Sequence, residues 1–411
     1  MTALTLTEYK CREAVPLSDE ARDALRRLVP TVKVAPTVGI PKHYDLTPSH
    51  VVGSVHTDDL DLVIRPKLPV SRVMFMLSYA LRPDEWREWR ERGVPFSYEQ
   101  TDSIVEAVIP SYVWHVGNAI GRGVLHGYRE RDETLQTVRG RIRFADQIRR
   151  QYGRCVPAEV RFDDYTADID ENRILKAALH RLQRIGIRAL DNRKRLKGYT
   201  HALSDVSQIE YPNDVAPQIT YTRLNQHYRP AVELARLILR SSSFDFSHGR
   251  VTGTTFLFDM NAVFENFVVT ALRDALQLSD RVFVQGGRGK RINLDAENRV
   301  RLQPDISWWD GPVCRFVGEV KYKAVSVAGM KNADLYQLLA YTVATQLDDG
   351  LLIYARGEGE PMTYAIPLAG KRLHVAALDL EGSPQDILQE IEKLAVEVRQ
   401  YYARSGVSQV A

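Results

Sequence analysis

The sequence has few of the features that mark secreted or membrane proteins. Its three cysteines lie far apart and form no CxxC pair, so neither a zinc site nor a disulfide framework is expected (Cys11, Cys155 and Cys314). No stretch approaches the roughly 20 apolar residues of a membrane span, and the N-terminus lacks the basic segment and apolar run that secretion requires. These absences predict a protein without a membrane segment, in the reducing cytoplasm.

The sequence also carries little net charge. Its 55 Lys and Arg residues nearly balance 52 Asp and Glu residues, which leaves +3 at pH 7 with histidine neutral. Attraction to nucleic acid must therefore come from local basic patches rather than from a global field. Of the 411 residues, 44% are hydrophobic, enough for two or three cores at about 150 residues per domain.

Hydrophobic patterning divides the chain into three parts. Residues 1–70 alternate short β-branched runs with Gly and Pro, which predicts a small β-rich N-terminal domain. Residues 71–245 carry apolar positions at helical spacing, which predicts a mainly helical middle region. After a stretch rich in Ser, Gly and Thr, residues 246–411 alternate helices with short apolar strands, as in an α/β domain.

Single residues mark the expected ends of helices in the middle region. Ser71 and Asp170 are placed to cap two helices, because their side-chain oxygens can accept from free N–H groups of a first turn. Pro110 predicts a kink or a break between two helices. Pro230 is expected near the start of a helix or at a break.

A row of arginines occupies alternate positions in the middle region. Residues 138–144 predict a strand bent at Gly140, which would place Arg139, Arg141 and Arg143 on one face. Such a row can meet phosphates or the acidic groups of a partner, and it can equally be a solvated strand face. The basic cluster at residues 193–197 leaves the same two alternatives open.

The stretch from residue 302 to residue 344 carries the clearest chemistry. It predicts a strand bearing Asp305, a turn at residues 310–312, a second strand bearing Glu319 and Lys321, and an amphipathic helix. Phosphodiester hydrolysis needs a divalent cation to hold the scissile phosphate and to activate water. Mg²⁺ prefers one or two carboxylates and leaves its other positions to water and substrate. Asp305 and Glu319 can supply those carboxylates.

Lys321 lies two residues after Glu319 and on a strand projects to the same face. A carboxylate and an ammonium group then form a rigid pair beside the metal, while Val320 points into the core. The triplet alone is weak, because a surface Glu and Lys pair on an edge strand has the same sequence. The apolar flank, the upstream Asp305 and the downstream helix make a nuclease centre the leading interpretation.

Other residues near this stretch are less decisive. Glu265 lies on a predicted helix, either as a further carboxylate of the site or on an exposed face. Asp259 is expected to cap that helix. Gln337 can orient water or a phosphate, or it can be an ordinary polar helix residue. The glycine-rich residues 286–291 lack the spacing of a phosphate loop and predict a basic loop between strands.

The order of Pro304, Asp305, Glu319, Lys321 and helical Gln337 resembles that of the PD-(D/E)xK nuclease superfamily. Most of the chain from about residue 45 onward also resembles the McrC family, the nuclease subunits of McrBC modification-dependent restriction systems. The similar segments come in the same order as in that family. They are LDLVIRPKLPVSRVMFMLSYAL, TVRGRIRF, DIDENRILKAAL, TRLNQHYRPAVELARLIL and FLFDMNAVFENFV.

This resemblance implies a restriction-endonuclease-like α/β domain in which Asp305 and Glu319 bind Mg²⁺ and Lys321 is catalytic, with Glu265 and Gln337 as further candidates. It implies a subunit that binds no nucleotide but joins and stimulates a hexameric AAA+ GTPase, McrB. It also implies cleavage of double-stranded DNA containing 5-methylcytosine. Glu319 stands where Asp is common, which the superfamily pattern allows. The arginine row at residues 139–143 is a candidate contact with the partner or with phosphate.

Two other functions stay open at the level of the sequence. One is a non-catalytic adaptor that activates an AAA+ partner, against which the intact Asp305, Glu319 and Lys321 set argues. The other is a stand-alone nuclease acting in repair or on RNA. The long region ahead of the nuclease stretch argues against the second.

Overall fold

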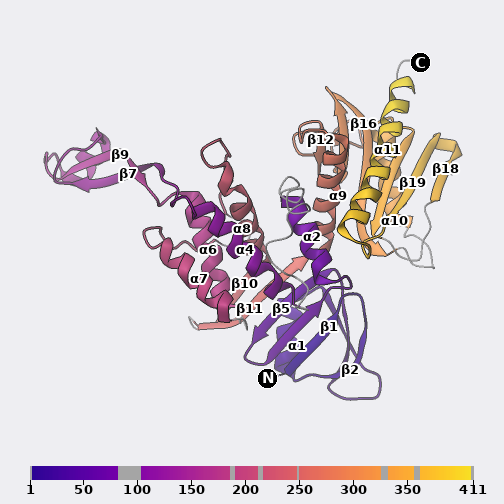
Figure 1. Ribbon diagram of the computed structural model, residues 1–411, viewed down its shortest axis with the longest axis horizontal. Coiled ribbons are helices and arrows are strands. Elements are labelled where there is room, and N and C mark those ends of the chain that lie inside the picture. The colour runs from indigo at the N-terminus through magenta and orange to yellow at the C-terminus, as the bar shows by residue number, and fades with distance from the viewer. Residues whose placement is uncertain are drawn as a thin grey trace. The chain divides into compact units, whose positions relative to one another are not determined.

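The computed structural model describes residues 2–81, 103–185, 190–211, 216–247, 250–324, 332–355 and 362–408. Packing divides the chain into two compact units: residues 1–107 with 257–411, and residues 108–256. The first and last of the three predicted parts therefore share a unit, and the division into three domains stays a prediction. Figure 1 shows the elements of both units coloured along the chain.

The start of the chain is β-rich and contributes strands to two sheets. One of them pairs β1 (Thr2–Thr7) in parallel with β6 (Leu60–Arg65), and β6 in turn antiparallel with β5 (Val51–Thr57). The other has the order β2-β4-β3. Its strands are β2 (Arg12–Pro16), β3 (Val32–Pro36) and β4 (His43–Pro48). Period-2 patterning predicted the β character correctly.

Helix α1 (Asp19–Leu28) packs into this β-rich region and was not expected from the sequence. Its first turn is capped by Ser18, whose Oγ accepts from the Ala21 amide at 3.1 Å. Leu25 on α1 is fully buried with Leu4 and Leu62 from the neighbouring strands. The helix therefore supplies part of the apolar surface that closes this core.

The C-terminal part is built on a six-stranded mixed sheet with the order β12-β15-β16-β17-β19-β18. β15 and β16 pair antiparallel, whereas β16 with β17 and β17 with β19 pair in parallel. The strands are β12 (Phe283–Gln285), β15 (Ile306–Asp310), β16 (Val313–Ala324), β17 (Asp349–Ala355), β18 (Met362–Ile366) and β19 (Lys371–Leu378). The sheet matches the alternation of helices and short strands predicted from the sequence.

Helices cover both faces of this sheet. Leu338 and Tyr341 of α10 (Asn332–Ala344) pack in one core with Val317 of β16. On the opposite face α11 (Pro384–Ser408) stacks Tyr401 on Phe316, and α9 (Met260–Leu276) lies against β16 and α11. Burial from both sides explains why the β16 sequence lacks strict alternation.

The second unit combines helices with a small three-stranded sheet. Strands β7 (Gly127–Leu135) and β9 (Ala158–Thr166) pair antiparallel, and β8 (Arg141–Ile142) adds a short edge. In Figure 1 this sheet extends away from the helices of its own unit. Those helices are α4 (Ile104–Ile120), α6 (Asp170–Arg184), α7 (Leu190–Ala202) and α8 (Arg229–Ser241), with α5 (Phe144–Gln151) beside the sheet.

Several helix ends differ from the sequence prediction. Pro110 lies inside the single helix α4, so the predicted kink or break does not divide the segment. Its neighbours Ile109 and Tyr112 are fully buried, and this packing offsets the backbone bond that proline removes. Ser71 lies within α2 (Val70–Leu81), and Asp170 lies in the first turn of α6 rather than capping it.

Two other helix predictions are confirmed. Pro230 lies in the first turn of α8, where its missing N–H costs nothing. Asp259 caps α9 by accepting from the amides of residues 261 and 262. Among the described residues, no helix combines the length and the apolar character needed to cross a membrane.

Candidate catalytic centre

The β15–β16 hairpin brings Asp305 and Glu319 together. Asp305 immediately precedes β15, and its neighbour Ile306 pairs with Gly318 of β16. The Val320 amide donates to Asp305 Oδ2 at 2.9 Å, and the Asp305 amide donates to Glu319 Oε2 at 3.3 Å. Each carboxylate is thus held by the backbone of the other strand. Gly311, with φ of +57°, forms the connecting turn in a conformation that favours glycine.

Lys321 lies on the same side of β16 as Glu319, as the strand period predicts. Its ammonium group forms an ion pair with Glu319 Oε1. The Glu319 side chain is 2% exposed and that of Lys321 is 21% exposed, so a buried carboxylate is paired with a partly exposed lysine. Val320 is buried on the opposite side, as expected from the sequence.

Glu265 approaches this pair from α9. Its Oε1 accepts from Gln285 Nε2 at 2.9 Å, and the same amide donates to Asn266 at 2.7 Å. Burial and the charge of Asp305 raise the pKa of Glu265, so the two carboxyl groups are close enough to repel each other. Glu265 therefore lies partly buried near Asp305, and its membership of the site stays a prediction. No pattern in the sequence predicted the contact of Gln285 with Glu265.

Gln337 orients another side chain rather than a carboxylate. Its Nε2 donates to the Tyr341 hydroxyl at 2.7 Å, one helical turn along α10. That hydroxyl donates in turn to the Gln303 carbonyl at 3.2 Å, two residues before Asp305. Burial and the charges of Glu319 and Asp305 raise the pKa of Tyr341, which places its ring beside both acids. The spacing of four residues between Gln337 and Tyr341 was the available signal.

The electrostatics of the centre are unfavourable for bare carboxylates. Burial and the neighbouring Glu319 raise the pKa of Asp305, and burial also raises the pKa of Glu319. Burial opposes the charge of Lys321, but the bond to Glu319 and the two acids outweigh it and raise the pKa of this lysine. One ammonium group thus faces three carboxyl groups. Such a site favours a second cation.

The donor set fits a small hard cation. Asp305 and Glu319 offer carboxylate oxygens, which Mg²⁺ prefers, and only one fixed positive charge opposes them. Within the described ranges, no group of three or more His, Cys, Asp or Glu residues is arranged to hold a metal ion. Two protein carboxylates with the remaining positions left to water and phosphate are, however, ordinary ligation for Mg²⁺.

The arginine row does not lie on one continuous strand, as the sequence predicted for residues 138–144. Only Arg141 and Ile142 form a strand, and Phe144 already begins α5. Arg139 pairs with Asp164 at 3.3 Å, and Arg143 pairs with Asp132 at 3.3 Å and with Asp146. Acidic side chains of the same small sheet therefore neutralise two of the three arginines, which a reading of the basic residues alone overlooked. A contact of the row with phosphate or partner stays a prediction.

The basic loop at residues 286–291 lies between β12 and β13 (Ile292–Asn293), as predicted. Lys290 makes a hydrogen bond within the protein, in which its ammonium group donates to the Gly311 carbonyl at 2.7 Å. Arg288 is exposed, and its charge lowers the pKa of Glu265, so the guanidinium group lies near the centre. The sequence indicated only a basic loop at these residues, and a contact of Arg288 with phosphate is a prediction.

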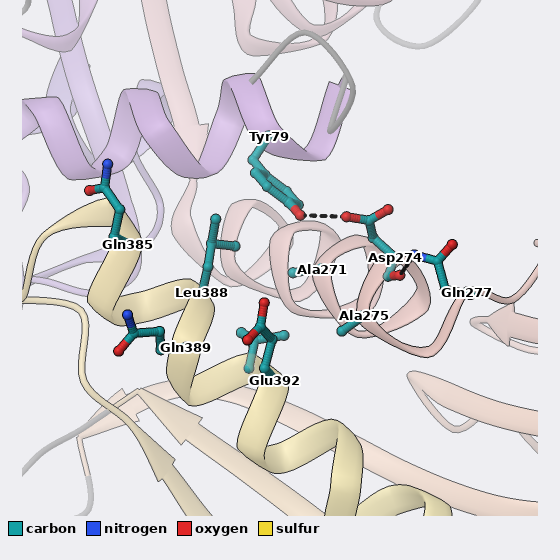
Figure 2. Close-up of a pocket in the computed structure, with 10 residues that line it drawn as sticks. Tyr79, Ala271, Asp274, Ala275, Gln277, Gln385, Leu388, Gln389 and Glu392 are labelled. Atoms are coloured by element: carbon teal, nitrogen blue, oxygen red, sulfur yellow. Dashed lines mark hydrogen bonds between the residues drawn. The ribbon is translucent and has the colours of Figure 1, made fainter. Parts of the chain in front are cut away.

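Figure 2 shows a pocket of ≈ 460 Å³ bounded by α2, α9 and α11, away from the carboxylates. Tyr79 donates to Asp274 Oδ2 across it at 2.8 Å. Its lining includes neither Asp305 nor Glu319 nor Lys321. The candidate chemistry thus lies at the sheet rather than in this pocket.

The two units, with their β-rich and helical parts and the mixed sheet, define an α/β protein whose whole fold recurs in a solved structure. This structure is the half-complex from the tetradecameric assembly of Thermococcus gammatolerans McrB AAA+ hexamers with bound McrC. A chain of it is 18% identical with a TM-score of 0.58, over 95% of this chain and 99% of that chain. At this identity the likeness establishes the fold alone.

The chain belongs to the McrBC family. Residues 46–355 match the family described as McrBC 5-methylcytosine restriction system component. The Thermococcus gammatolerans McrBC complex is a second similar structure, at 21% identity and a TM-score of 0.43 over 67% of this chain and 88% of that chain. No curated protein matches the sequence. The resemblance to this restriction family stated from the segments is confirmed, and the protein is a restriction-system subunit.

Proposed function

We propose that this chain is the Mg²⁺-dependent endonuclease subunit of a complex that cleaves DNA containing 5-methylcytosine. The observation that carries the proposal is the buried Asp305, Glu319 and Lys321 group, in which adjacent strands hold two carboxylates and one ammonium group within a family of restriction components. Asp305 and Glu319 would hold the metal, which supplies charge stabilisation and an activated water.

The protein's own residues then have distinct tasks. Lys321 would use its charge to stabilise the phosphate oxygens or to hold the attacking water, since its partly exposed side chain lies beside the buried Glu319. Glu265 adds a nearby carboxyl group that can accept a proton, because its raised pKa increases its basicity. Tyr341 and Gln337 fix the segment that leads into Asp305.

The proposal includes a partner. McrC in the similar structure is bound to McrB AAA+ hexamers, and we extend this assembly to the present chain as part of the proposal. The chain would join and stimulate an McrB-like GTPase, and GTP hydrolysis would bring the DNA to the carboxylate centre. A cytoplasmic location fits this role.

The test is cleavage of a 5-methylcytosine-containing duplex by the chain together with its GTPase partner, GTP and Mg²⁺. Glu319→Ala and Lys321→Ala are expected to abolish cutting while partner binding and GTPase stimulation remain. Full cleavage by either variant would overturn the assignment of the site. Stimulation of GTP hydrolysis by a wild-type chain that never cuts would indicate a non-catalytic adaptor. Cutting without any partner would indicate a stand-alone nuclease.

A further inference from the structure

A buried polar cluster links the N-terminal sheet to the strand that carries Glu319 and Lys321. Glu8 follows β1 and Lys67 follows β6, and these two strands are parallel neighbours. Both side chains reach Tyr322, the residue directly after Lys321. Tyr322 and Glu8 are each 1% exposed. Residues separated by more than 250 positions in the sequence thus meet at the end of the catalytic segment.

The contacts on Tyr322 hold both its backbone and its ring. Lys67 Nζ donates to the Tyr322 carbonyl at 3.1 Å and lies 4.1 Å from the centre of the Tyr322 ring. The Tyr322 hydroxyl donates to Glu8 Oε2 at 3.3 Å. The same Glu8 oxygen accepts from the Lys67 amide at 3.2 Å, so the three residues form one closed set.

The strand is irregular at this point. The register of β16 against β17 shifts between Lys321 and Ala324, so the ladder does not continue regularly through Tyr322. Irregularities of this kind re-aim side chains and are frequent beside active sites. Lys67 bonds the Tyr322 carbonyl where the regular ladder is interrupted, and it therefore fixes the strand immediately beyond Lys321.

The same N-terminal region also holds the helix that carries Glu265. The His50 carbonyl accepts from the Met260 amide at 2.8 Å, and His50 lies 3.8 Å from Asp259, the cap of α9. Phe264 of α9 packs near Tyr322, with ring centres 5.7 Å apart. Both elements that bring carboxylates to the centre are thus anchored on one β-rich support.

We infer that Glu8, Lys67 and Tyr322 are positioning residues that set the placement of Lys321 and Glu319 from the N-terminal sheet. The inference rests on the proposed nuclease function. The β-rich N-terminal region is then a structural part of the cutting unit. Removing its contacts displaces Lys321 while leaving DNA binding and partner stimulation in place.

The cluster lowers the stability of the fold, and a positioning role explains why it is present. Glu8 Oε1 is buried without a hydrogen-bond partner among the described residues, and burial lowers the pKa of Lys67 against its charged form. Buried polar groups that are only partly satisfied reduce stability relative to apolar packing. Positioning of an active-site strand is a role for which such a cost is commonly found.

The experiment compares Lys67→Met, which keeps the aliphatic stem, with Lys67→Arg, which retains a donor and a cation. Cleavage of the methylated duplex is followed under single-turnover conditions with the GTPase partner, GTP and Mg²⁺. Lys67→Met is expected to lower the cleavage rate constant by about 10²-fold, the cost of roughly 1 Å of misplacement. The DNA concentration at half-saturation and GTPase stimulation should stay unchanged, and Lys67→Arg should recover most of the rate.

Controls separate this inference from general instability. Lys33→Met removes an exposed lysine of β3 and should leave cleavage unchanged. Tyr322→Phe removes only the hydroxyl and is expected to fold, with a loss of about 10-fold or less. Equal rates for wild type and Lys67→Met, or no recovery in Lys67→Arg, would overturn the positioning role.

Hydrogen exchange of residues 316–324 tests the link without any cleavage. Lys67→Met should speed exchange there and leave the β1–β6 sheet unchanged. If the wild-type chain does not cut DNA, the proposed function fails, and faster exchange would still establish the structural link. Unchanged exchange would exclude the link itself, whatever the activity.

Discussion

Two buried acidic clusters on the same sheet have opposite charge balances. At the start of β17, Asp349 accepts from Arg372 through both oxygens at 2.8 Å and contacts His374 at 2.7 Å. At β16, Asp305 and Glu319 share the single cation of Lys321. One carboxylate has two positively charged or polar partners, whereas two carboxylates have one.

The pKa shifts of the two clusters follow these balances. Burial opposes the charge of Asp349, but the bonds to Arg372 and His374 outweigh it and hold the pKa of Asp349 well below its usual range. Burial and mutual repulsion instead raise the pKa of Asp305. The first cluster therefore stabilises the folded sheet, whereas the second is an electrostatically unfavourable arrangement of the kind that is frequent in functional sites. Burial alone does not distinguish a catalytic acid from a structural one.

The largest expected effect is on cleavage, from Asp305→Asn. The variant retains an oxygen that can accept from the Val320 amide but removes a charge that would hold the metal. Loss of several kcal/mol of transition-state stabilisation corresponds to about 10³-fold or more in rate. Its melting temperature should stay the same or rise, because repulsion with Glu319 is relieved. A marked fall in melting temperature with normal cleavage would show that Asp305 stabilises the fold, as Asp349 does, and takes no part in cleavage.

The next effect concerns Glu8, an acid whose pKa is also raised by burial. Burial raises the pKa of Glu8 to about 7 from 4.5, so its contribution to stability is fully present below pH 4.5 and is lost as the pH rises through 7. The total change is on the order of 3 kcal/mol. Glu8→Gln should remove this fall, which thermal unfolding from pH 5 to pH 8 would measure. Parallel curves for the variant and wild type would contradict the prediction.

A smaller effect on stability is expected from Asp349→Asn. Loss of charge-assisted bonds to Arg372 and His374 should destabilise the fold by about 2 kcal/mol, measured by denaturant unfolding at pH 7. Because the pKa of Asp349 is lowered, its contribution is present above its unfolded pKa and is lost as the pH falls. Cleavage by the folded variant should be normal. Asp348→Asn next to it, at a more exposed position, is the matched control.

The smallest effect is expected from Arg288→Ala in the basic loop. Removal of one phosphate contact should weaken DNA binding a few-fold and lower the salt slope of binding by about 1. Fluorescence anisotropy at several salt concentrations would measure both. The cleavage rate at saturating DNA should hardly change, in contrast to Asp305→Asn. If the variant binds DNA normally but cuts it slowly, Arg288 acts in the cleavage step rather than in binding.

Local patterns predicted that Asp305, Glu319 and Lys321 would come together, because these residues are close in sequence. The period of a strand places Glu319 and Lys321 on one side, and the turn at Gly311 returns the chain to Asp305. Glu265 was left between two alternatives, because no local pattern shows which helix face meets the sheet. The role of Gln337 is indirect, since only the packed structure brings Tyr341 to Gln303.

Contacts between segments distant in sequence explain what the local patterns did not predict. The arginine row reads as an unpaired basic face until β9 and β7 supply Asp164 and Asp132. The continuity of α4 through Pro110 depends on buried neighbours. The cluster of Glu8, Lys67 and Tyr322 joins the two ends of the sequence, where no spacing rule applies. Its residues are separately unremarkable in the sequence.

The division of the chain into units also affects the order in which its parts can fold during synthesis. Residues 108–256 form a continuous unit that can fold as soon as it leaves the ribosome, since domains generally fold as units in order of synthesis. The unit of residues 1–107 and 257–411 cannot be completed until β16 has been made. The contact between Lys67 and Tyr322 therefore cannot form until 255 further residues have been synthesised. A nascent chain therefore cannot bring Asp305, Glu319 and Lys321 together with the Glu8 and Lys67 contacts until β16 has been made.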